Sequence, residues 1–268
     1  MKELSLEEVK SLLLEMMIDI DSFCRKAGIN YSLNYGSLLG AARHKGFIPW
    51  DDDIDLMMYR DDYERFLSEY HSDKYKVLSI ERDPGWCYPL FARITDVRTK
   101  MTINGETQSQ HGLWIAIIVV DNMPHPNPHY QEWDKFRYSL KRWLDLIDLK
   151  IKMTTFGQSF GKNLLKGTLY PIFAAIPAKK IARHVEKRRC IYNATNTTFC
   201  AEWLGGGRAY YFPRYFMNEY IELDFEGHKF MSIKEYDCYL KIVYGDYMVM
   251  PPKEKQVPLH NYKAYLMD

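Results

Sequence analysis

A run of acids that leads directly into an apolar strand constrains this chain more than any other feature. Residues 51–53 are all aspartate, and the sequence Ile-Asp-Leu-Met follows them. In an extended strand this alternation points Asp53 and Asp55 to one face and sends Ile54 and Leu56 into the core. Mg²⁺ takes a few carboxylates and fills its other positions with water and phosphate oxygens. The sequence therefore predicts a metal site at Asp53 and Asp55, and the alternative is a solvated acidic turn.

A Gly36-Ser37 turn lies upstream of the acids, between a predicted strand at residues 31–35 and a predicted helix at residues 38–44. Amide groups at a helix N-terminus have no intrahelical partner, and the helix dipole favours an anion there. Gly36 lets the main chain approach an anion closely, and Ser37 adds a hydroxyl donor. The turn therefore predicts a phosphate site beside the metal site.

Two arginines, Arg43 and Arg93, are candidates for further phosphate contacts. One guanidinium group binds two oxygens at once, which suits a phosphate. Arg43 lies between the Gly-Ser turn and the acids, and Arg93 lies in a strand-like segment of its own. The alternative for each is a solvated side chain.

Residues 34–66 resemble the opening block of the LicD family, which is grouped with the fukutin-related proteins in the nucleotidyltransferase fold. The similarity runs through residues 36–40, 46–55 and 62–64, and weaker similarity extends to residues 244–248. The resemblance covers most of the chain. It implies transfer of phosphocholine from CDP-choline to a sugar hydroxyl of a bacterial surface glycan precursor of the teichoic acid type. It also implies one or two Mg²⁺ ions as cofactor, with Mn²⁺ as an alternative.

The chain departs from the family pattern at Ala116. The family's third carboxylate lies on a later strand and is followed five residues on by a second acid. Here Ala116 takes the place of the first and Asp121 fits the second. In this fold the third carboxylate helps to hold metal and accepts the proton of the attacking hydroxyl. The chain is either a degenerate member or an inactivated variant, and we favour the second because the rest of the site is intact.

Aromatic residues near the site suggest how choline would be held. A quaternary ammonium donates no hydrogen bond and binds aromatic faces instead. Trp50 is therefore predicted to contact substrate, and Trp86, Tyr88 and Trp114 are further candidates for a cage.

Two rival functions stay open. One is a transferase of the same fold that uses another nucleotide or polyol phosphate, and the other is a non-catalytic nucleotide-binding or glycan-binding protein.

Composition bounds the partners. Lys and Arg number 36 against 35 Asp and Glu, and the net charge of +1 gives no global attraction to nucleic acid. Five scattered cysteines show no paired spacing and indicate reduced thiols. The N-terminal residues lack the basic and apolar regions of a secretion signal. We therefore expect a cytoplasmic protein with no nucleic-acid partner.

An apolar segment at residues 164–177 is too short to span a bilayer. Beside a basic cluster, such a segment suits docking on anionic lipid at the inner face of the membrane, where a lipid-linked glycan precursor would be met. The alternative is a pair of packed helices with solvated charges. The basic cluster consists of Lys179, Lys180, Arg183, Lys187, Arg188 and Arg189.

The order of the predicted elements indicates an α/β fold. The expected architecture is a nucleotidyltransferase-like mixed sheet flanked by helices, with an appended mainly helical region. Capping boxes predict helices that follow Ser5 and Ser232. We predict a catalytic core over residues 1–125, a mainly helical and membrane-facing region over residues 126–200, and a C-terminal segment over residues 201–268 that packs back on the core.

Overall fold

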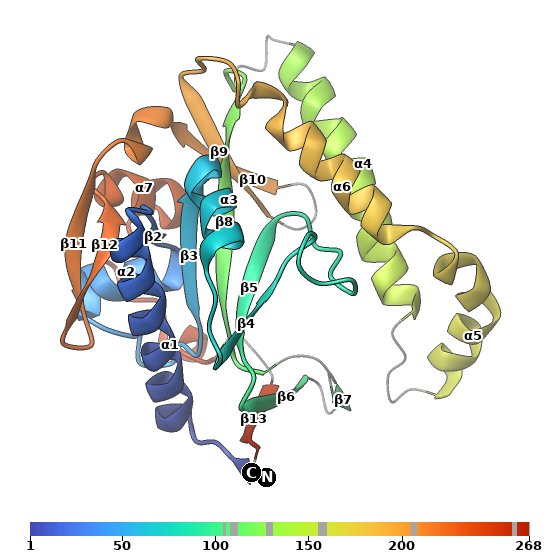
Figure 1. Ribbon diagram of the computed structural model, residues 1–268, viewed down its shortest axis with the longest axis horizontal. Helices are drawn as coiled ribbons and strands as arrows, with labels where there is room; N and C mark the ends of the chain where they lie inside the picture. The colour runs from blue at the N-terminus through green and yellow to red at the C-terminus, as the bar shows by residue number, and fades with distance from the viewer. Residues whose placement is uncertain are drawn as a thin grey trace.

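A computed structural model describes residues 1–103, 106–107, 112–126, 131–154, 160–204, 208–258 and 262–267. Within these residues a mixed sheet is flanked by helices, which confirms the predicted α/β fold (Figure 1). The helices are α1 (Leu6–Ala27), α2 (Tyr35–His44), α3 (Arg60–Glu69), α4 (Gln131–Thr154), α5 (Phe160–Ala174), α6 (Ala178–Arg189) and α7 (Tyr236–Tyr244).

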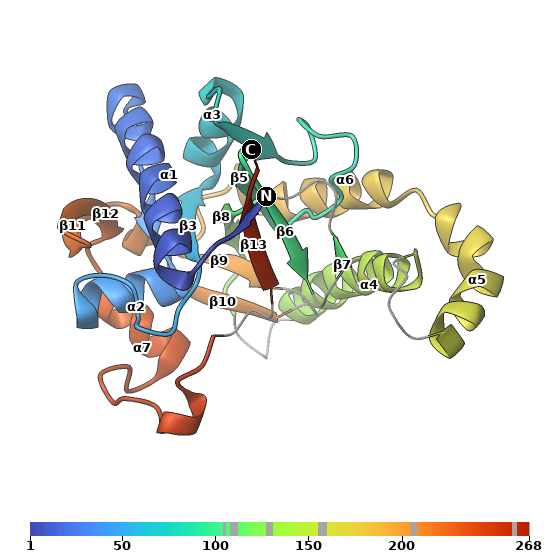
Figure 2. The same ribbon diagram turned by 90° about the horizontal axis from the view of Figure 1, so that it is seen from below.

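The central sheet has the strand order β10-β9-β8-β3-β2, and β5 pairs with β8 while β4 pairs with β5. Only the β3–β8 pair is parallel among the pairings described in this sheet. Helices α1 and α3 lie on one side of the sheet and α7 lies on the other (Figure 2). The strands are β2 (Ser32–Leu33), β3 (Ile54–Tyr59), β4 (Tyr75–Leu78), β5 (Phe91–Asp96), β8 (Trp114–Met123), β9 (Phe199–Leu204) and β10 (Arg208–Pro213).

Two smaller sheets complete the core. One has the order β1-β13-β6-β7 and brings the two ends of the chain together (Figure 1). The other is the hairpin β11–β12, which packs on β2. Their strands are β1 (Lys2–Glu3), β6 (Thr99–Ile103), β7 (Glu106–Thr107), β11 (Tyr220–Phe225), β12 (His228–Ile233) and β13 (Tyr262–Leu266).

Helix α1 follows its sequence signals closely. Ser5 Oγ accepts a hydrogen bond from the Glu8 amide, and the Glu8 carboxylate accepts one from the Ser5 amide. Such a cap contributes about 1 kcal/mol. Gly28 ends the helix with φ of 64°, a left-handed conformation that glycine adopts without steric cost. The buried face, spaced by three and four residues, comprises Val9, Leu13, Met16, Met17, Ile20 and Cys24.

Strand β3 shows the predicted alternation. Ile54 and Leu56 are fully buried, whereas Asp55 between them is only partly buried. The strand runs beside β8 in the middle of the sheet, so its apolar face is covered while Asp55 points to the other side. The core therefore fixes which way the acidic residues face.

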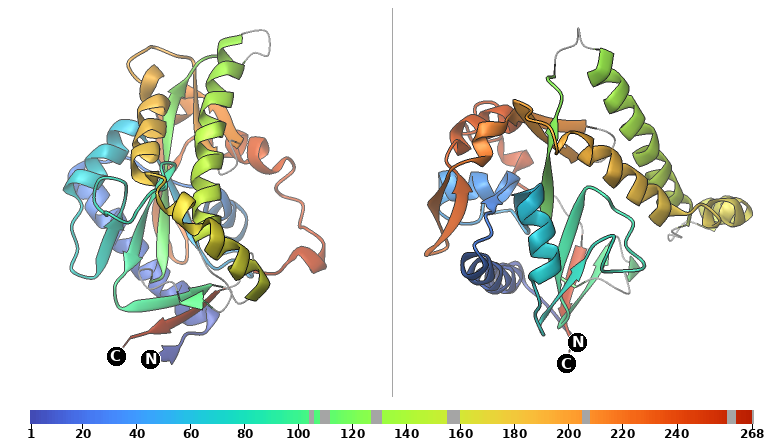
Figure 3. Two further views of the ribbon diagram at one scale, coloured as in Figure 1. Left: turned by 90° about the vertical axis from the view of Figure 1, so that its right-hand side faces the viewer. Right: turned by 45° about the horizontal axis from the view of Figure 1, so that its top comes forward.

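Helices α4, α5 and α6 form an arm, described over residues 131–154 and 160–189, at one end of the molecule. Helices α4 and α6 run side by side and α5 lies at their far end (Figure 3). Leu140 and Leu144 of α4 pack with Val185 of α6 in one buried cluster. Among the described residues, no helix is both long enough and apolar enough to cross a bilayer.

The predicted capping box at Ser232 is wrong, although the helix that it predicted is present as α7. Helix α7 follows Glu235 and receives no side-chain cap. Ser232 lies instead in strand β12, where its hydroxyl donates to the Ile233 carbonyl. The Ile233 amide donates to Ser32 Oγ of β2 at 3.0 Å. Strand pairing and this contact with β2 override the local helical signal.

Candidate active site

The first turn of helix α2 is bonded directly to the start of strand β3. The Asn34 amide donates to the Asp55 carbonyl at 2.8 Å, and the Asp55 amide donates to Ser37 Oγ at 2.9 Å. Asn34 is the N-cap of α2, and its Oδ1 accepts from the Tyr35 amide at 2.8 Å. The helix therefore begins at Tyr35, earlier than the sequence predicts, and Gly36 and Ser37 lie inside its first turn.

Gly36 makes room for a carboxylate. A Cβ atom at this position would overlap Asp51 Oδ2, so any larger residue would displace the aspartate. Asp51 therefore lies against the N-terminal end of α2, where unpaired amides and the helix dipole favour negative charge.

Three carboxylates gather beside this helix end. One oxygen from each of Asp51, Asp52 and Asp53 lies within 4.8 Å of the other two, and the first two are only 7% and 6% exposed. Burial, followed by the charges of Asp53 and Asp52, raises the pKa of the Asp51 carboxyl to about 7. Closely packed oxygen ligands of this kind are what a hard divalent cation requires. The residues present therefore fit Mg²⁺.

Two of these carboxylates, Asp51 and Asp53, line a hollow of about 650 Å³ between α2 and the segment that follows α7, which we call the acidic hollow. Asp53 and Asp55 both line it, in accord with the strand pattern, and so do three residues predicted to bind substrate: Gly36, Arg43 and Trp50. The Arg43 guanidinium donates to the Tyr247 carbonyl at 2.7 Å and so joins the two walls. The polar lining residues that the sequence reasoning left unassigned are Tyr35, Asp51, Tyr244, Asp246, Tyr247 and Lys255.

Ala116 lies in the same row of the sheet as one of the predicted metal ligands. Asp55 of β3 stands opposite Ala116 of β8, which stands opposite Arg93 of β5. Residues in register on adjacent strands point to the same face. An acid at position 116 would therefore stand between Asp55 and Arg93. Of the predicted site residues, Ser37, Arg93 and Ala116 are not among the described residues that line the acidic hollow.

Arg93 is enclosed by aromatic rings. Its guanidinium carbon lies 3.8 Å from the ring centre of Trp114 and 5.5 Å from that of Trp86. Burial lowers its pKa to about 10, and its Nε has no hydrogen-bond partner among the described residues. These two tryptophans therefore contact an arginine. Of the four aromatic residues considered for choline, Trp50 alone is among the described residues that line the acidic hollow.

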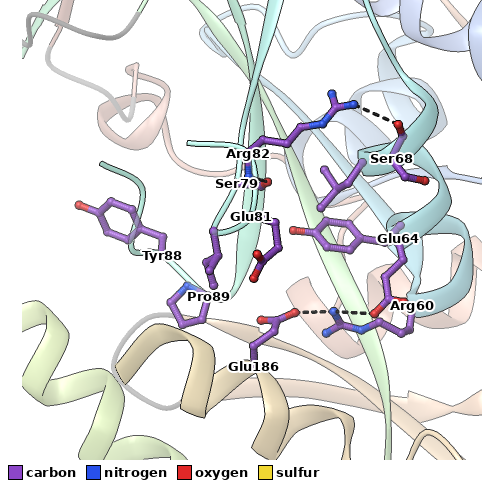
Figure 4. A pocket seen from close by; sticks show the side chains of 12 residues that line it. Arg60, Glu64, Ser68, Ser79, Glu81, Arg82, Tyr88, Pro89 and Glu186 are labelled. Carbon is purple, nitrogen blue, oxygen red and sulfur yellow. Dashed lines mark hydrogen bonds and ion pairs between the residues drawn. The ribbon is translucent and has the colours of Figure 1, made fainter. Parts of the chain in front are cut away.

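Asp121 of β8 lies near the C-terminal end of β3, away from Asp55, and makes structural contacts there. Arg60 makes a bidentate contact with the Asp121 carboxylate, with distances of 2.7 Å from Nε to Oδ1 and 2.8 Å from Nη2 to Oδ2. Arg189 Nη2 lies 2.9 Å from Asp121 Oδ2. Burial disfavours the charged carboxylate, but the Arg189 and Arg60 charges lower its pKa to about 2. Arg60 also pairs with Glu186 beside a second hollow of about 450 Å³ (Figure 4). The network ties α3 and α6 to β8.

Comparisons with known proteins point to one family. Residues 28–150 match the family described as LicD/FKTN/FKRP, nucleotidyltransferase domain. The lipopolysaccharide cholinephosphotransferase LicD of Haemophilus influenzae is 31% identical over 281 aligned residues, which cover all of both chains. The ribitol 5-phosphate transferase FKRP of Homo sapiens is 61% identical over 36 residues, 13% of this chain and 7% of that protein. An uncharacterized Rickettsia typhi protein, RT0683, is 35% identical over 80 residues, 28% of this chain and 26% of that protein.

Proposed function

The chain belongs to the LicD/FKTN/FKRP nucleotidyltransferase family, and we propose that it is built to transfer phosphocholine from CDP-choline to a sugar hydroxyl of a lipid-linked bacterial surface glycan precursor, such as one of the teichoic acid type. One observation carries the proposal. In the acidic hollow, Asp51, Asp53 and Asp55 adjoin the N-terminal turn of helix α2. The full-length relative from Haemophilus influenzae supports a transferase that acts on a glycan.

The residues of the acidic hollow can hold a diphosphate together with metal. Asp53 and Asp55 would hold one or two Mg²⁺ ions, with Mn²⁺ as an alternative, and Asp51 lies close enough to take part. A bound divalent cation supplies charge neutralisation at the diphosphate oxygens. Amides in the first turn of α2, at Gly36 and Ser37, would donate to the same oxygens.

The proposed reaction is an in-line displacement at the phosphorus that bears choline. The acceptor hydroxyl oxygen forms the new bond to phosphorus, and the bond from phosphorus to the CMP oxygen breaks, so CMP leaves. Arg43 lines the acidic hollow and would neutralise charge on the phosphate of the leaving CMP. The hydroxyl proton needs an acceptor, which in the family is the carboxylate that Ala116 replaces here.

The aromatic walls of the acidic hollow suit a quaternary ammonium. Trp50, Tyr35, Tyr244 and Tyr247 all line it, and Asp246 adds an acid beside them. Aromatic faces together with one carboxylate are the usual receptor for such a cation. This arrangement supports choline as the group that the donor carries.

The surroundings of Arg93 support the interpretation that Ala116 replaces an acid. Arg93 is half-buried, and its buried Nε has no hydrogen-bond partner among the described residues, which costs free energy because a donor has left water without a compensating hydrogen bond. Arg93 stands in register with Ala116, so a carboxylate at that position would lie beside it. We therefore propose that the site is formed for an acid at position 116 and that this chain is an inactivated form of the enzyme.

A polyol phosphate donor is the second candidate. The match to FKRP, named a ribitol 5-phosphate transferase, covers only 36 residues but is 61% identical there. A transferase of that kind would use the same carboxylates and differ in the pocket for the transferred group. The aromatic walls of the acidic hollow favour choline, since a polyol needs hydrogen-bond partners rather than ring faces.

Equilibrium binding separates the two donors. We expect CDP-choline to bind this chain in the presence of Mg²⁺, and free choline to compete with it. A nucleoside triphosphate or a nucleotide-activated ribitol phosphate should compete only weakly. Tighter binding of the activated ribitol phosphate would favour the second candidate, and no binding of any of these nucleotides would contradict a nucleotide-dependent transferase.

The helical arm is proposed to face the membrane that carries the acceptor. In residues 131–189 Lys and Arg outnumber Asp and Glu by 14 to 5, so this segment carries a net +9 whereas the whole chain carries +1. Apolar side chains are exposed on the same arm, including Ile172 at 64%, Tyr138 at 61% and Leu149 at 44%. Basic charge beside exposed apolar side chains suits an anionic lipid surface.

A further inference from the structure

A buried carboxyl group, that of Glu202, is hydrogen-bonded to the N-cap of helix α2. We call the first turn of α2, whose amides at Gly36 and Ser37 are proposed to donate to phosphate, the phosphate-contacting turn. Glu202 of β9 is fully buried, and its Oε2 accepts from Asn34 Nδ2 at 2.7 Å. Its Oε1 is hydrogen-bonded to the Tyr239 hydroxyl, which also lies 2.5 Å from Asn34 Oδ1. Glu202, Asn34 and Tyr239 thus form a closed triangle that joins β9, the N-cap of α2 and helix α7.

The triangle is connected to the acidic hollow through Asn34. The side chain of Asn34 caps the Tyr35 amide, and its backbone amide holds the Asp55 carbonyl. Tyr35 has φ of 41°, a left-handed conformation that is unfavourable for a residue other than glycine. The next residue, Gly36, is the one that lies against Asp51. An unfavourable backbone conformation persists only where its surroundings fix it, and Asn34 Oδ1 accepts a hydrogen bond from the Tyr35 amide.

We propose that Glu202 is a positioning residue for the phosphate-contacting turn, holding Asn34 so that the first turn of α2 keeps its place against Asp51 and Asp55. The proposal rests on the proposed function for what the turn binds. Glu202 is hydrogen-bonded to Asn34 and Tyr239, neither of which is assigned to metal or phosphate. It would act through the hydrogen bonds of Asn34.

The hydrogen-bond count of the triangle indicates which substitution preserves it. The Tyr239 hydroxyl has one proton and cannot donate to both Glu202 and Asn34. A proton on Glu202 Oε1 would let Glu202 donate to Tyr239 and Tyr239 donate to Asn34. Burial raises the pKa of Glu202 to about 7, which agrees with this arrangement. The titratable neighbours are Tyr35, Tyr239 and Cys200, whose pKa values burial also raises.

Glutamine reproduces the protonated arrangement. Its carbonyl accepts from Asn34 and its NH₂ group donates to Tyr239, so every member of the triangle keeps a partner. Leucine in place of Glu202 removes the acceptor and leaves the Asn34 amide group buried without one. Glu202→Gln and Glu202→Leu therefore form a matched pair of nearly equal volume.

Two measurements test the proposal on the full chain. The first is amide hydrogen exchange of residues 34–44 without ligand, and the second is the Kd for CDP-choline with Mg²⁺. We expect Glu202→Gln to keep both within about threefold of the parent chain. Glu202→Leu and Asn34→Ala should raise exchange and Kd at least tenfold. Met16→Ala, a buried change in α1, is the control for lost stability and should leave the exchange of residues 34–44 and the Kd unchanged.

Each outcome decides a separate point. Unchanged exchange and Kd in folded Glu202→Leu would overturn the positioning role, and so would equal effects in Met16→Ala at a similar loss of Tm. Where Glu202→Leu does not fold, unchanged exchange in Asn34→Ala overturns it instead. A parent chain that does not bind CDP-choline would refute the proposed donor, while the exchange measurement would still decide the role of Glu202.

Discussion

Asp55 and Arg93 stand in one row of the central sheet, on strands β3 and β5, with Ala116 of β8 between them. In this row the Ala116 methyl group lies between Asp55, an acid proposed to bind metal, and the half-buried guanidinium group of Arg93. A carboxylate at position 116 would neighbour both. In the proposed reaction, this relationship would account for a chain that keeps the proposed donor pocket and lacks the proposed proton acceptor.

Loss of a proposed metal ligand should weaken cation binding without weakening the fold. Asp53→Ala removes one of the charges that raise the pKa of Asp51, so it relieves repulsion in the metal-free protein. We expect an unchanged or slightly higher Tm without metal and loss of the Tm increase that Mg²⁺ gives the parent chain. Asp224→Ala, at an exposed position of β11, is the control. A steep fall in Tm without metal would argue against a metal site here.

Stability should depend on pH through Glu202. The pKa of Glu202 is about 7 in the folded protein and about 4.5 when unfolded, so the folded form binds the extra proton between these values. Its contribution is therefore fully present below about pH 4.5 and is lost as the pH rises to 7. Relative to Glu202→Gln, the free energy of unfolding of the parent should fall across this window by on the order of 3 kcal/mol. Parallel curves in urea unfolding would contradict the burial of an ionisable group here.

The Asp121 network should be important for stability. Asp121→Ala leaves Arg60 and Arg189 buried without their common partner. Breaking a buried pair in this way costs about 3–5 kcal/mol, because the remaining charge is uncompensated. We expect a loss of this size in chemical unfolding, with the salt bridge Lys141–Asp145, an exposed pair, as the control through Asp145→Ala. A change below about 1 kcal/mol at Asp121 would refute the assigned contacts.

The helical arm should bind anionic lipid. We expect the protein to co-sediment with phosphatidylglycerol vesicles and not with phosphatidylcholine vesicles, and added salt should weaken the binding. Ile172→Asp should reduce it, because this side chain is exposed on the arm. Val97→Asp makes a similar change at an exposed position outside the arm and should have no effect. Equal recovery with both vesicle types, or with neither, would favour packed helices with solvated charges.

Local signals sufficed for the elements that surround the site. The capping box before α1 and the alternation in β3 are encoded by adjacent residues, so the sequence predicted both. Ser232 shows where this fails, because its strand pairs with β11 in a hairpin and contacts Ser32 of β2, which is far away in the sequence. The pattern of neighbouring residues does not show which strands pair or which distant side chains meet.

The position of Ala116 was predicted by alignment to the family, whereas the role of Glu202 was not predicted at all. Glu202 bonds to Asn34, which is 168 residues away, so no local spacing connects them. The one available signal was an acid inside the apolar strand sequence Phe-Cys-Ala-Glu-Trp-Leu. Such an acid must find buried partners, but only the fold shows which partners it has.

The most direct test is the rate of CMP release by Ala116→Asp, measured with CDP-choline, Mg²⁺ and a bacterial glycan precursor as acceptor. The parent chain should bind the donor yet turn it over extremely slowly, and restoring the acid should raise the rate by a factor on the order of a hundred or more. Ala116→Asn, which has nearly the same shape and cannot accept the proton, should stay at the parent rate. An unchanged rate of CMP release in Ala116→Asp would contradict the account.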